Sequence, residues 1–326
     1  MRIVFAGTPE FACPSLERLI ESGHEVAAVV TQPDKPSGRG RKIVFSPIKE
    51  AAIKHGIPVL QPERLRKPPF VEVLRPYNPE IMIVAAYGKI LPQDILDLPR
   101  LGCVNIHASL LPKYRGAAPI NRAIMNGEKE TGITLMKMDA TMDTGDILIT
   151  ERIPILDDDD ALSVTNMLSV IGADMLIRYL DDLGREGEVK GTPQDHAAAT
   201  YAPAIEKVDC RVDWSADYER ILCHIRGLAP EPGAYTWLDD RIIKILRAEP
   251  LFGMDKEYEE VGRHEEIEPG TVIHTIKGQG PLVKVNGGLI VLHKLKPEGK
   301  AVMSGQDFVN GGFVKKGDRF GWAMNN

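Results

Sequence analysis

A strand, a helix and a second strand follow one another within the first 31 residues. Residues 2–6 form a short apolar run, and a helical spacing of apolar side chains follows Gly7 and ends near Gly23. Residues 25–31 form the next apolar run. Two strands joined by a helix pair in parallel through a right-handed crossover, so this unit predicts a parallel α/β sheet.

The alternation of strands and helices continues along the first half of the chain. Further apolar runs lie at 57–60, 81–85, 103–107 and 133–138, with helical stretches between most of them. An α/β fold with a Rossmann-like, open and mostly parallel sheet is the economical interpretation. Its first turn, AGTPEF, lacks the GxGxxG spacing that a dinucleotide requires, so NAD binding is not expected.

The pattern changes after residue 207, which predicts a second domain. The preceding stretch is rich in Gly, Pro, Thr and Ala and has little periodicity. Short β segments then follow at 234–237, 242–248, 270–276, 282–285 and 289–295. They favour a small, OB-like β-barrel, a fold that commonly binds oligonucleotides. The expected organisation is therefore a catalytic domain at 1–190, a linker at 191–206 and a barrel at 207–326.

Composition excludes several classes of protein. The chain has 43% hydrophobic and 26% charged residues, as globular proteins do. Its apolar runs are shorter than the roughly 20 residues of a membrane span, and the first of them breaks too early for a signal peptide, so we expect a cytoplasmic protein. The four cysteines form no CxxC pair and the eight histidines no HExxH motif, so no disulfide scaffold or metal site is expected.

The charge distribution bears on nucleic-acid binding. The net charge of −6 discourages such a partner. However, many acidic residues of the C-terminal part gather at 255–268, and outside that segment basic residues outnumber acidic ones. A basic run, RGRK at 39–42, lacks the glycine spacing of a phosphate-binding Walker loop. It is either a solvated surface loop or a contact for nucleic-acid phosphates.

Two polar residues end the strand predicted at 103–107. Side chains alternate along a strand, so Asn105 and His107 project from the same face. Open α/β sheets place their ligand crevices at the carboxyl ends of parallel strands. The pair is therefore either a binding or catalytic site, or a polar pair that satisfies its own hydrogen bonds.

A loop rich in aspartate, MDATMDTGD at 138–146, follows the strand at 133–138. We expect this loop, with Asp143, at the same carboxyl edge of the sheet. Its DTG triplet invites comparison with aspartic proteases, but the chain contains no second such triplet. Asp143 is otherwise a turn-forming residue, as Asp139 and Asp146 can be.

These residues resemble the folate-dependent formyltransferase family. NIH at 105–107, SLLP at 109–112 and DTGD at 143–146 carry the resemblance. It extends over nearly the whole chain to the members that formylate methionyl-tRNA, through FAGTPEF at 5–11, YRGAAPI at 114–120, IRGLAPEPGAYT at 225–236 and MSGQDF at 303–308. Two departures are Glu231, where a bulkier aromatic residue is expected, and the acidic segment 255–268.

The resemblance implies a role for several groups of residues. It assigns catalysis to Asn105, His107 and Asp143. It assigns reduced folate to the loop of Ser109, Leu110, Leu111 and Pro112, with residues 89–91 bordering the pterin. It assigns the acceptor end of a tRNA to the loop that carries Arg39, Arg41 and Lys42.

The activity implied by the resemblance is formyl transfer from 10-formyltetrahydrofolate to the α-amine of initiator methionyl-tRNA. No metal is expected, and the enzyme should be monomeric. One alternative is a formyltransferase for a small sugar-nucleotide or ribonucleotide amine, which would need neither the basic loop nor the barrel. Another is an RNA-binding module without activity, in which the three catalytic residues would be incomplete; all three are present.

Overall fold

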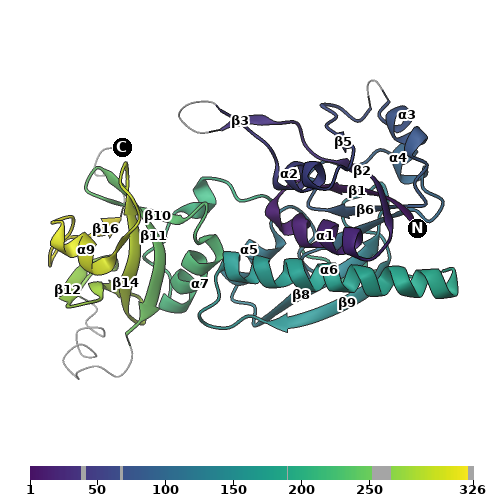
Figure 1. The fold of residues 1–326 in the computed structure, drawn as a ribbon. Helices are drawn as coiled ribbons and strands as arrows, with labels where there is room; N and C mark the ends of the chain where they lie inside the picture. The colour runs from purple at the N-terminus through teal and green to yellow at the C-terminus, as the bar shows by residue number, and fades with distance from the viewer. Residues whose placement is uncertain (38–41, 67–68, 189, 252–265, 322–326) are drawn as a thin grey trace. The chain divides into compact units, whose positions relative to one another are not determined.

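The computed structural model describes residues 1–37, 42–66, 69–188, 190–251 and 266–321 (Figure 1). The chain divides into two compact units that are interleaved in the sequence. The first unit comprises Met1–Pro119, Glu130–Pro154 and Val164–Pro203. The second comprises Ile120–Lys129, Ile155–Ser163 and Ala204–Asn326.

The first unit is built on a sheet that has seven strands among the described residues, in the order β5-β2-β1-β6-β7-β8-β9. Neighbouring strands from β5 to β7 are parallel, whereas β8 and β9 are antiparallel. The predicted mostly parallel, Rossmann-like sheet is therefore confirmed. Its strands are β1 (Arg2–Gly7), β2 (Glu25–Val30), β5 (Val59–Leu60), β6 (Ile81–Ala85), β7 (Cys103–His107), β8 (Glu130–Lys137) and β9 (Ile147–Pro154).

Helices cover both faces of this sheet. On one face lie α1 (Cys13–Glu21) and α6 (Ala161–Glu186), joined by an Arg18–Asp174 ion pair of 3.1 Å (Figure 1). Gly172 brings α6 close to β7, since a Cβ atom there would lie 2.8 Å from Ile106. The other face packs against α3 (Val71–Leu74) and α4 (Gln93–Leu96). Ile106 thus faces α6, and Asn105 and His107 point to the opposite side.

The long helix α6 is the one helix in the described part of the chain that is long and apolar enough to cross a membrane. Length and composition alone are weak evidence for a membrane span, because core helices of soluble proteins share them. Here 44% of the most apolar stretch of the helix is buried. Its N-terminus follows the acidic run at 157–160. Asp160 accepts a hydrogen bond from the Ser163 amide at 2.9 Å, which is the capping expected of an acidic residue at a helix start.

A short hairpin of the first unit follows β2. It pairs β3 (Lys35–Ser37) with β4 (Lys42–Val44), and α2 (Pro47–Lys54) follows. Ser46 caps α2 by accepting a hydrogen bond from the Lys49 amide at 3.1 Å. The Lys49 ammonium lies 2.5 Å from the Asp34 carboxylate, which ties the base of the hairpin to α2.

The segment at 192–202, which lies within the expected linker, is bonded to the first unit. Thr192 and Ile147 exchange two backbone hydrogen bonds of 2.8 and 2.9 Å. Further along, the Arg115 amide donates to Thr200 at 2.9 Å, and the Ala202 amide donates to Arg115 at 2.7 Å. The segment therefore lies against the loop after β7, and the first unit ends at Pro203.

The second unit contains an antiparallel sheet in the order β12-β13-β14-β11-β10-β16, with β15 on β14. A bridge between Thr271 and Arg319 joins the two ends of this order, so the sheet curls into a barrel. The five predicted strands and the small barrel are confirmed. They are β10 (Ala234–Leu238), β11 (Arg241–Pro250), β12 (Val272–Ile276), β13 (Gly280–Val285) and β14 (Gly288–Pro297); β15 (Met303–Ser304) and β16 (Phe320–Gly321) are shorter.

Two helices and two early segments of the chain complete the second unit. Its core includes Trp214, which stacks on Phe320 at 5.5 Å, and residues of α7 (Tyr218–Leu228) and α9 (Gly305–Asn310). Met125 of α5 (Pro119–Met125) packs against this core. Arg122 also pairs with Asp209 at 2.6 Å.

Candidate active site

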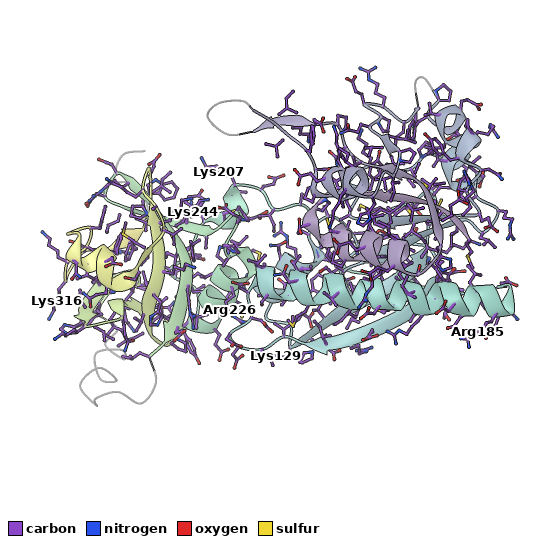
Figure 2. The ribbon with its side chains drawn as sticks, in the orientation of Figure 1. Lys129, Arg185, Lys207, Arg226, Lys244 and Lys316 are labelled. Carbon is purple, nitrogen blue, oxygen red and sulfur yellow. The ribbon has the colours of Figure 1, made fainter. Side chains whose placement is uncertain are left out.

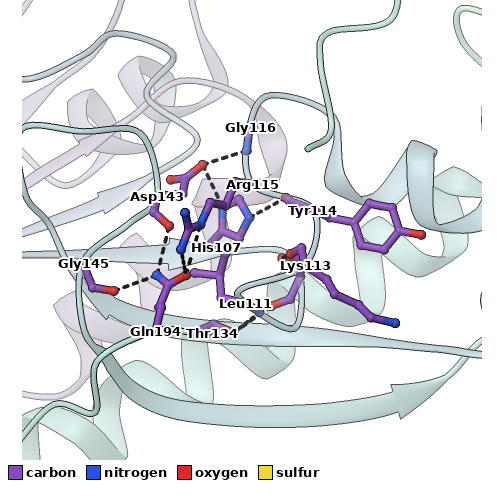
Figure 3. A network of polar contacts seen from close by, with 11 residues as sticks. His107, Leu111, Lys113, Tyr114, Arg115, Gly116, Thr134, Asp143, Gly145 and Gln194 are labelled. Atoms are coloured by element: carbon purple, nitrogen blue, oxygen red, sulfur yellow. Dashed lines mark hydrogen bonds and ion pairs between the residues drawn. The ribbon is translucent and has the colours of Figure 1, made fainter. Parts of the chain in front are cut away.

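His107 lies at the carboxyl end of β7 and is only 5% exposed (Figure 3). Its Nε2 atom is 3.0 Å from the Tyr114 carbonyl oxygen, and its Nδ1 atom is 3.7 Å from the Asp143 carboxylate. A neutral imidazole carries a proton on one nitrogen only. The carbonyl can only accept, so Nε2 donates to Tyr114, and Nδ1 is the nitrogen that faces the Asp143 carboxylate.

Asp143 reaches His107 by a route that differs from the predicted one. Because β8 is antiparallel to β7, Lys137 at its end pairs with Val104 near the start of β7. The loop therefore starts beside the amino end of β7. The expectation that it emerges at the carboxyl ends of the parallel strands was wrong. It folds back toward His107, where the Asp143 carboxylate accepts a hydrogen bond from the Gly116 amide at 2.8 Å.

Asn105 projects from the same face of β7 as His107 and is half-buried. Its side-chain amide has no hydrogen-bond partner among the residues that the structure describes. Polar groups at such positions are usually paired with protein or water. The amide is therefore available to a ligand beside the imidazole.

The loop at 109–112 is clamped to β8 by a threonine. The Thr134 hydroxyl donates to the Ser109 carbonyl at 2.7 Å and accepts from the Leu111 amide at 3.2 Å. The Ser109 hydroxyl donates to the Lys113 carbonyl at 2.6 Å, and the Leu111 side chain is buried. Leu110 and Pro112 are each partly buried.

The residues at 89–91 point in different directions. The Lys89 ammonium donates to the carbonyls of Pro62 and Glu63 at 2.6 and 3.0 Å, and burial lowers its pKa. Ile90 is 69% exposed, whereas Leu91 is buried in the core. Of the three side chains, Ile90 is the one that faces solvent.

The basic run at 39–42 is described only at its end. Arg39 and Arg41 lie outside the described residues, and only the backbone of Lys42 is placed, in β4. The acidic segment at 255–268 is described from residue 266 onward. The other departure, Glu231, lies 3.4 Å from the Lys244 ammonium in the second unit.

Two buried residues of the site were not predicted from the sequence. Arg115 is 2% exposed and Gln194 is 5% exposed; they contact each other, and Gln194 contacts the Asp143 loop (Figure 3). Arg115 lies in the YRGAAPI motif, which could have indicated it. Gln194 lies in a stretch without periodicity, where no local pattern distinguishes it.

Asp139, another carboxylate of this loop, bonds to neighbouring residues of the loop. Asp139 accepts hydrogen bonds from the Thr141 amide at 3.0 Å and from the Thr144 hydroxyl at 2.8 Å, as a turn-forming aspartate does. In the described part of the chain, no three His, Cys, Asp or Glu side chains gather in a group that could hold a metal ion. A separate cavity of about 500 Å³ is lined by second-unit residues, including Arg220 and His224.

The site combines a free amide, an imidazole and a carboxylate at the edge of a Rossmann-like sheet. An amide can stabilise an oxyanion, and an imidazole beside a carboxylate can move a proton. Such groups can assist the transfer of a carbonyl-containing group between two nitrogen atoms. The class of protein defined by the fold and site is thus a group transferase.

Comparison with known proteins gives the family. Residues 1–180 match the formyl transferase family, and residues 204–312 match the formyl transferase C-terminal domain. The chain belongs to the formyl transferase family. This confirms the resemblance seen in the sequence motifs.

Curated relatives cover nearly the full length of the chain. It is 48% identical to the methionyl-tRNA formyltransferase of Dictyoglomus turgidum, over 98% of this chain and 99% of the relative. It is also 48% identical to the methionyl-tRNA formyltransferase of Caldanaerobacter subterraneus subsp. tengcongensis, over 97% of this chain and 99% of the relative.

Solved structures share the fold at lower identity. HypX from Aquifex aeolicus, in complex with tetrahydrofolic acid, matches with a TM-score of 0.66 and 20% identity over 97% of this chain. The chain spans 48% of HypX. The methionyl-tRNA formyltransferase from Clostridium thermocellum matches with a TM-score of 0.55 and 18% identity, over 78% of this chain and 95% of that protein.

Proposed function

We propose that the chain transfers the formyl group of 10-formyltetrahydrofolate to the α-amino group of initiator methionyl-tRNA. The products are N-formylmethionyl-tRNA and tetrahydrofolate, as translation initiation requires. The observation that carries the proposal is the unpartnered amide of Asn105, on the same face of β7 as His107, whose Nδ1 atom lies 3.7 Å from the Asp143 carboxylate. The chain that holds them is 48% identical to a methionyl-tRNA formyltransferase over 98% of its length.

Asn105 is proposed to stabilise the oxyanion. The ester of the aminoacyl group withdraws electrons and lowers the pKa of the attacking amine below the usual α-amino value of about 7.7–8.0. Attack on the formyl carbon forms a new N–C bond and places negative charge on the formyl oxygen. An amide donor positioned at that oxygen contributes roughly 100-fold to 1000-fold to the rate.

His107 and Asp143 are proposed to move the proton. As the bond from the formyl carbon to the folate nitrogen breaks, the attacking amine loses a proton and the folate nitrogen gains one. The Nδ1 atom of His107 can relay this proton, because Nε2 is occupied by the Tyr114 carbonyl. The Asp143 carboxylate, 3.7 Å from Nδ1, stabilises the positive charge during the transfer.

The folate loop is proposed to hold the formyl donor. Thr134, which pairs with His107 across β7 and β8, fixes the backbone of Ser109 and Leu111. Leu110 and Pro112 complete the loop. Ile90, in the loop after β6, is proposed to border the pterin. The formyl group arrives activated on the folate, so the reaction requires no covalent enzyme intermediate.

The second unit and the β3–β4 hairpin are proposed to bind the tRNA. Basic side chains of the second unit include Lys207, Lys244 and Lys316 (Figure 2). Cations at such positions neutralise backbone phosphates without reading sequence. Arg39, Arg41 and Lys42 are proposed to contact the acceptor end. Because charged tRNA is a cytoplasmic substrate, we propose a cytoplasmic enzyme, acting as a monomer.

The test is formylation of charged initiator tRNA with 10-formyltetrahydrofolate. We expect transfer by the unmodified protein and a loss of roughly 100-fold or more in kcat for His107→Ala. The absence of transfer by the unmodified protein would refute the tRNA substrate. Transfer to a small sugar-nucleotide amine instead would support the alternative acceptor, and full activity of His107→Ala would refute the role of the imidazole.

A further inference from the structure

A buried arginine and a buried glutamine lie behind the candidate catalytic residues (Figure 3). The Nε and Nη2 atoms of Arg115 both donate to the Gln194 side-chain oxygen, at 3.1 and 2.7 Å. Nη2 also lies 3.2 Å from Nδ1 of His196. Neither contact is with a carboxylate. Burial of a cation is unfavourable unless hydrogen bonds replace its water, and the Gln194 oxygen accepts two of the bonds that this guanidinium donates.

The amide nitrogen of Gln194 contacts the catalytic loop. It donates to the Asp143 carbonyl at 2.9 Å and to the Gly145 carbonyl at 2.7 Å. The side chain thus uses two acceptor and two donor positions at once, which is the full capacity of a glutamine amide. The Arg115 donors fix which end is oxygen, since a flipped amide would set N–H groups against N–H groups.

The turn that Gln194 holds has an unusual backbone. Asp143 has a φ angle of 55°, in the left-handed region that non-glycine residues rarely adopt. Next to it, Gly145 packs so closely on β8 that a Cβ atom would lie 1.8 Å from the Lys137 carbonyl oxygen. The turn is therefore held between β8 on one side and Gln194 on the other.

We propose that Gln194, oriented by Arg115, is a positioning residue that holds the Asp143 carboxylate against His107. The inference rests on the proposed catalytic role of Asp143. Gln194 touches no reacting atom. It fixes the Asp143 backbone, while the Gly116 amide, next to Arg115 in the chain, fixes the carboxylate at 2.8 Å. The 192–202 segment is then part of the active site.

Kinetics of two variants test this role. Gln194→Met keeps the size of the side chain and removes all four hydrogen bonds, whereas Gln194→Glu keeps the acceptor for Arg115 and sets an oxygen against the two loop carbonyls. For both we expect a loss of roughly 10-fold to 100-fold in kcat, with KM for 10-formyltetrahydrofolate within about twofold, because small displacements of catalytic groups have effects of this size. Gln93→Met, at an exposed glutamine of α4, is the matched control and should retain full activity.

A double-mutant cycle separates positioning from general stability. In an Asp143→Asn background, Gln194→Met should add less than about twofold to the loss in kcat, because its effect acts through Asp143. The assays are run below the Tm of every variant. Independent losses that multiply, or wild-type kcat in both Gln194 variants, would overturn the proposal.

A spectroscopic readout keeps the test independent of turnover. The ¹⁵N–¹H resonance of Gly116 reports its hydrogen bond to the Asp143 carboxylate. It should shift in both Gln194 variants, to a position near that in Asp143→Asn, and stay unchanged in Gln93→Met. An unchanged Gly116 resonance in the Gln194 variants would overturn the proposal even if the protein formylated another acceptor. Absence of tRNA formylation with a shifted resonance would refute the proposed function alone.

Discussion

At the scale of single residues, the amide of Asn105 is the group on which the proposed chemistry depends most directly. We predict that Asn105→Ala lowers kcat by roughly 100-fold to 1000-fold, because one oxyanion donor is lost. KM for both substrates should change little, since the contact forms only as the oxyanion develops. Steady-state kinetics with charged initiator tRNA measures both quantities.

The matched control for this variant is Asn166→Ala, on the exposed face of α6. It should leave kcat and KM unchanged. An Asn105→Ala enzyme with normal kcat and a raised KM would show that the amide binds substrate without stabilising the transition state. That outcome would contradict the assignment.

Partly buried histidines predict a pH dependence of stability. Burial lowers the pKa of His224 below its usual value of 6.5, although a hydrogen bond to the Cys210 carbonyl acts in the other direction. Its Nε2 atom is buried without a partner among the described residues, so a proton there would have no acceptor. Above pH 6.5 both folded and unfolded states are neutral at this residue. Below it the unfolded state binds the proton first, so stability falls as the pH decreases.

We therefore predict that the Tm falls between pH 7.5 and 5.5, by the equivalent of up to about 1.4 kcal/mol per pH unit for this group. The fall should be smaller in His224→Asn, whose amide can still donate to the Cys210 carbonyl. Thermal unfolding followed by circular dichroism at several pH values measures it. Equal falls in the two proteins would refute the role of His224; His24 and His293, whose pKa values burial also lowers, would then account for the effect.

Single residues were predictable where a local rule applies to them. Strand alternation places Asn105 and His107 on one face, and the structure has them there. The position of Asp143 depends on the direction of β8, which its sequence does not encode. Gln194 acts through contacts with residues about 50 and 80 positions earlier in the chain, and such contacts leave no local pattern.

At the scale of elements, Thr134 of β8 holds the proposed folate loop. Its side chain is fully buried, and its hydroxyl satisfies the Ser109 carbonyl and the Leu111 amide. We predict that Thr134→Val, which keeps the shape, lowers the free energy of unfolding by about 1–3 kcal/mol, because two buried backbone groups lose their partner. KM for 10-formyltetrahydrofolate should rise, because the loop is released.

Urea denaturation and folate kinetics test this prediction. Thr131→Val is the control: Thr131 is also buried in β8, but its hydroxyl does not bond to the loop. It should change KM for folate by less than twofold. A Thr134→Val variant with reduced stability and an unchanged KM would contradict the link between the loop and folate.

Elements with a strong apolar pattern were predicted well. Residues 81–85 and 103–107 are strands as expected, because buried parallel strands are continuously apolar. The reversal of direction at β8 was not predicted, because the apolar pattern of a strand does not depend on the direction of the neighbouring strand. The β3 and β4 strands have three residues each, too few for any periodicity.

At the scale of the whole molecule, the second unit includes two segments from the part of the sequence that otherwise forms the first unit. Residues 120–129 and 155–163 belong to the second unit although they precede the end of the first. Hydrogen bonds from Asn121 to the Gly227 carbonyl and from Arg226 to the Leu156 carbonyl hold them there. Composition located the change near residue 207, but the earlier segments are short and carry no barrel-like pattern.

Two shortened chains test the division of labour between the units. Residues 1–203 contain every residue of the candidate active site, including Gln194 and the 192–202 segment, whereas residues 1–190 lack that segment. We predict that 1–203 binds tetrahydrofolate and does not formylate tRNA. We predict that 1–190 binds tetrahydrofolate at least about tenfold more weakly, because it loses the contacts of Thr200 and Ala202 with the backbone of Tyr114 and Arg115, next to the proposed folate loop. Isothermal titration calorimetry measures the binding.

The comparison requires that both fragments be folded. Met125 packs on the second-unit core, so Met125→Gln is introduced into both fragments to avoid an exposed apolar side chain. Far-UV circular dichroism and Tm then establish whether each keeps its sheet. Equal binding by two folded fragments would show that the 192–202 segment is dispensable for folate. If 1–203 folds but loses folate binding, as well as tRNA formylation, the second unit supports the donor site, contrary to the division proposed.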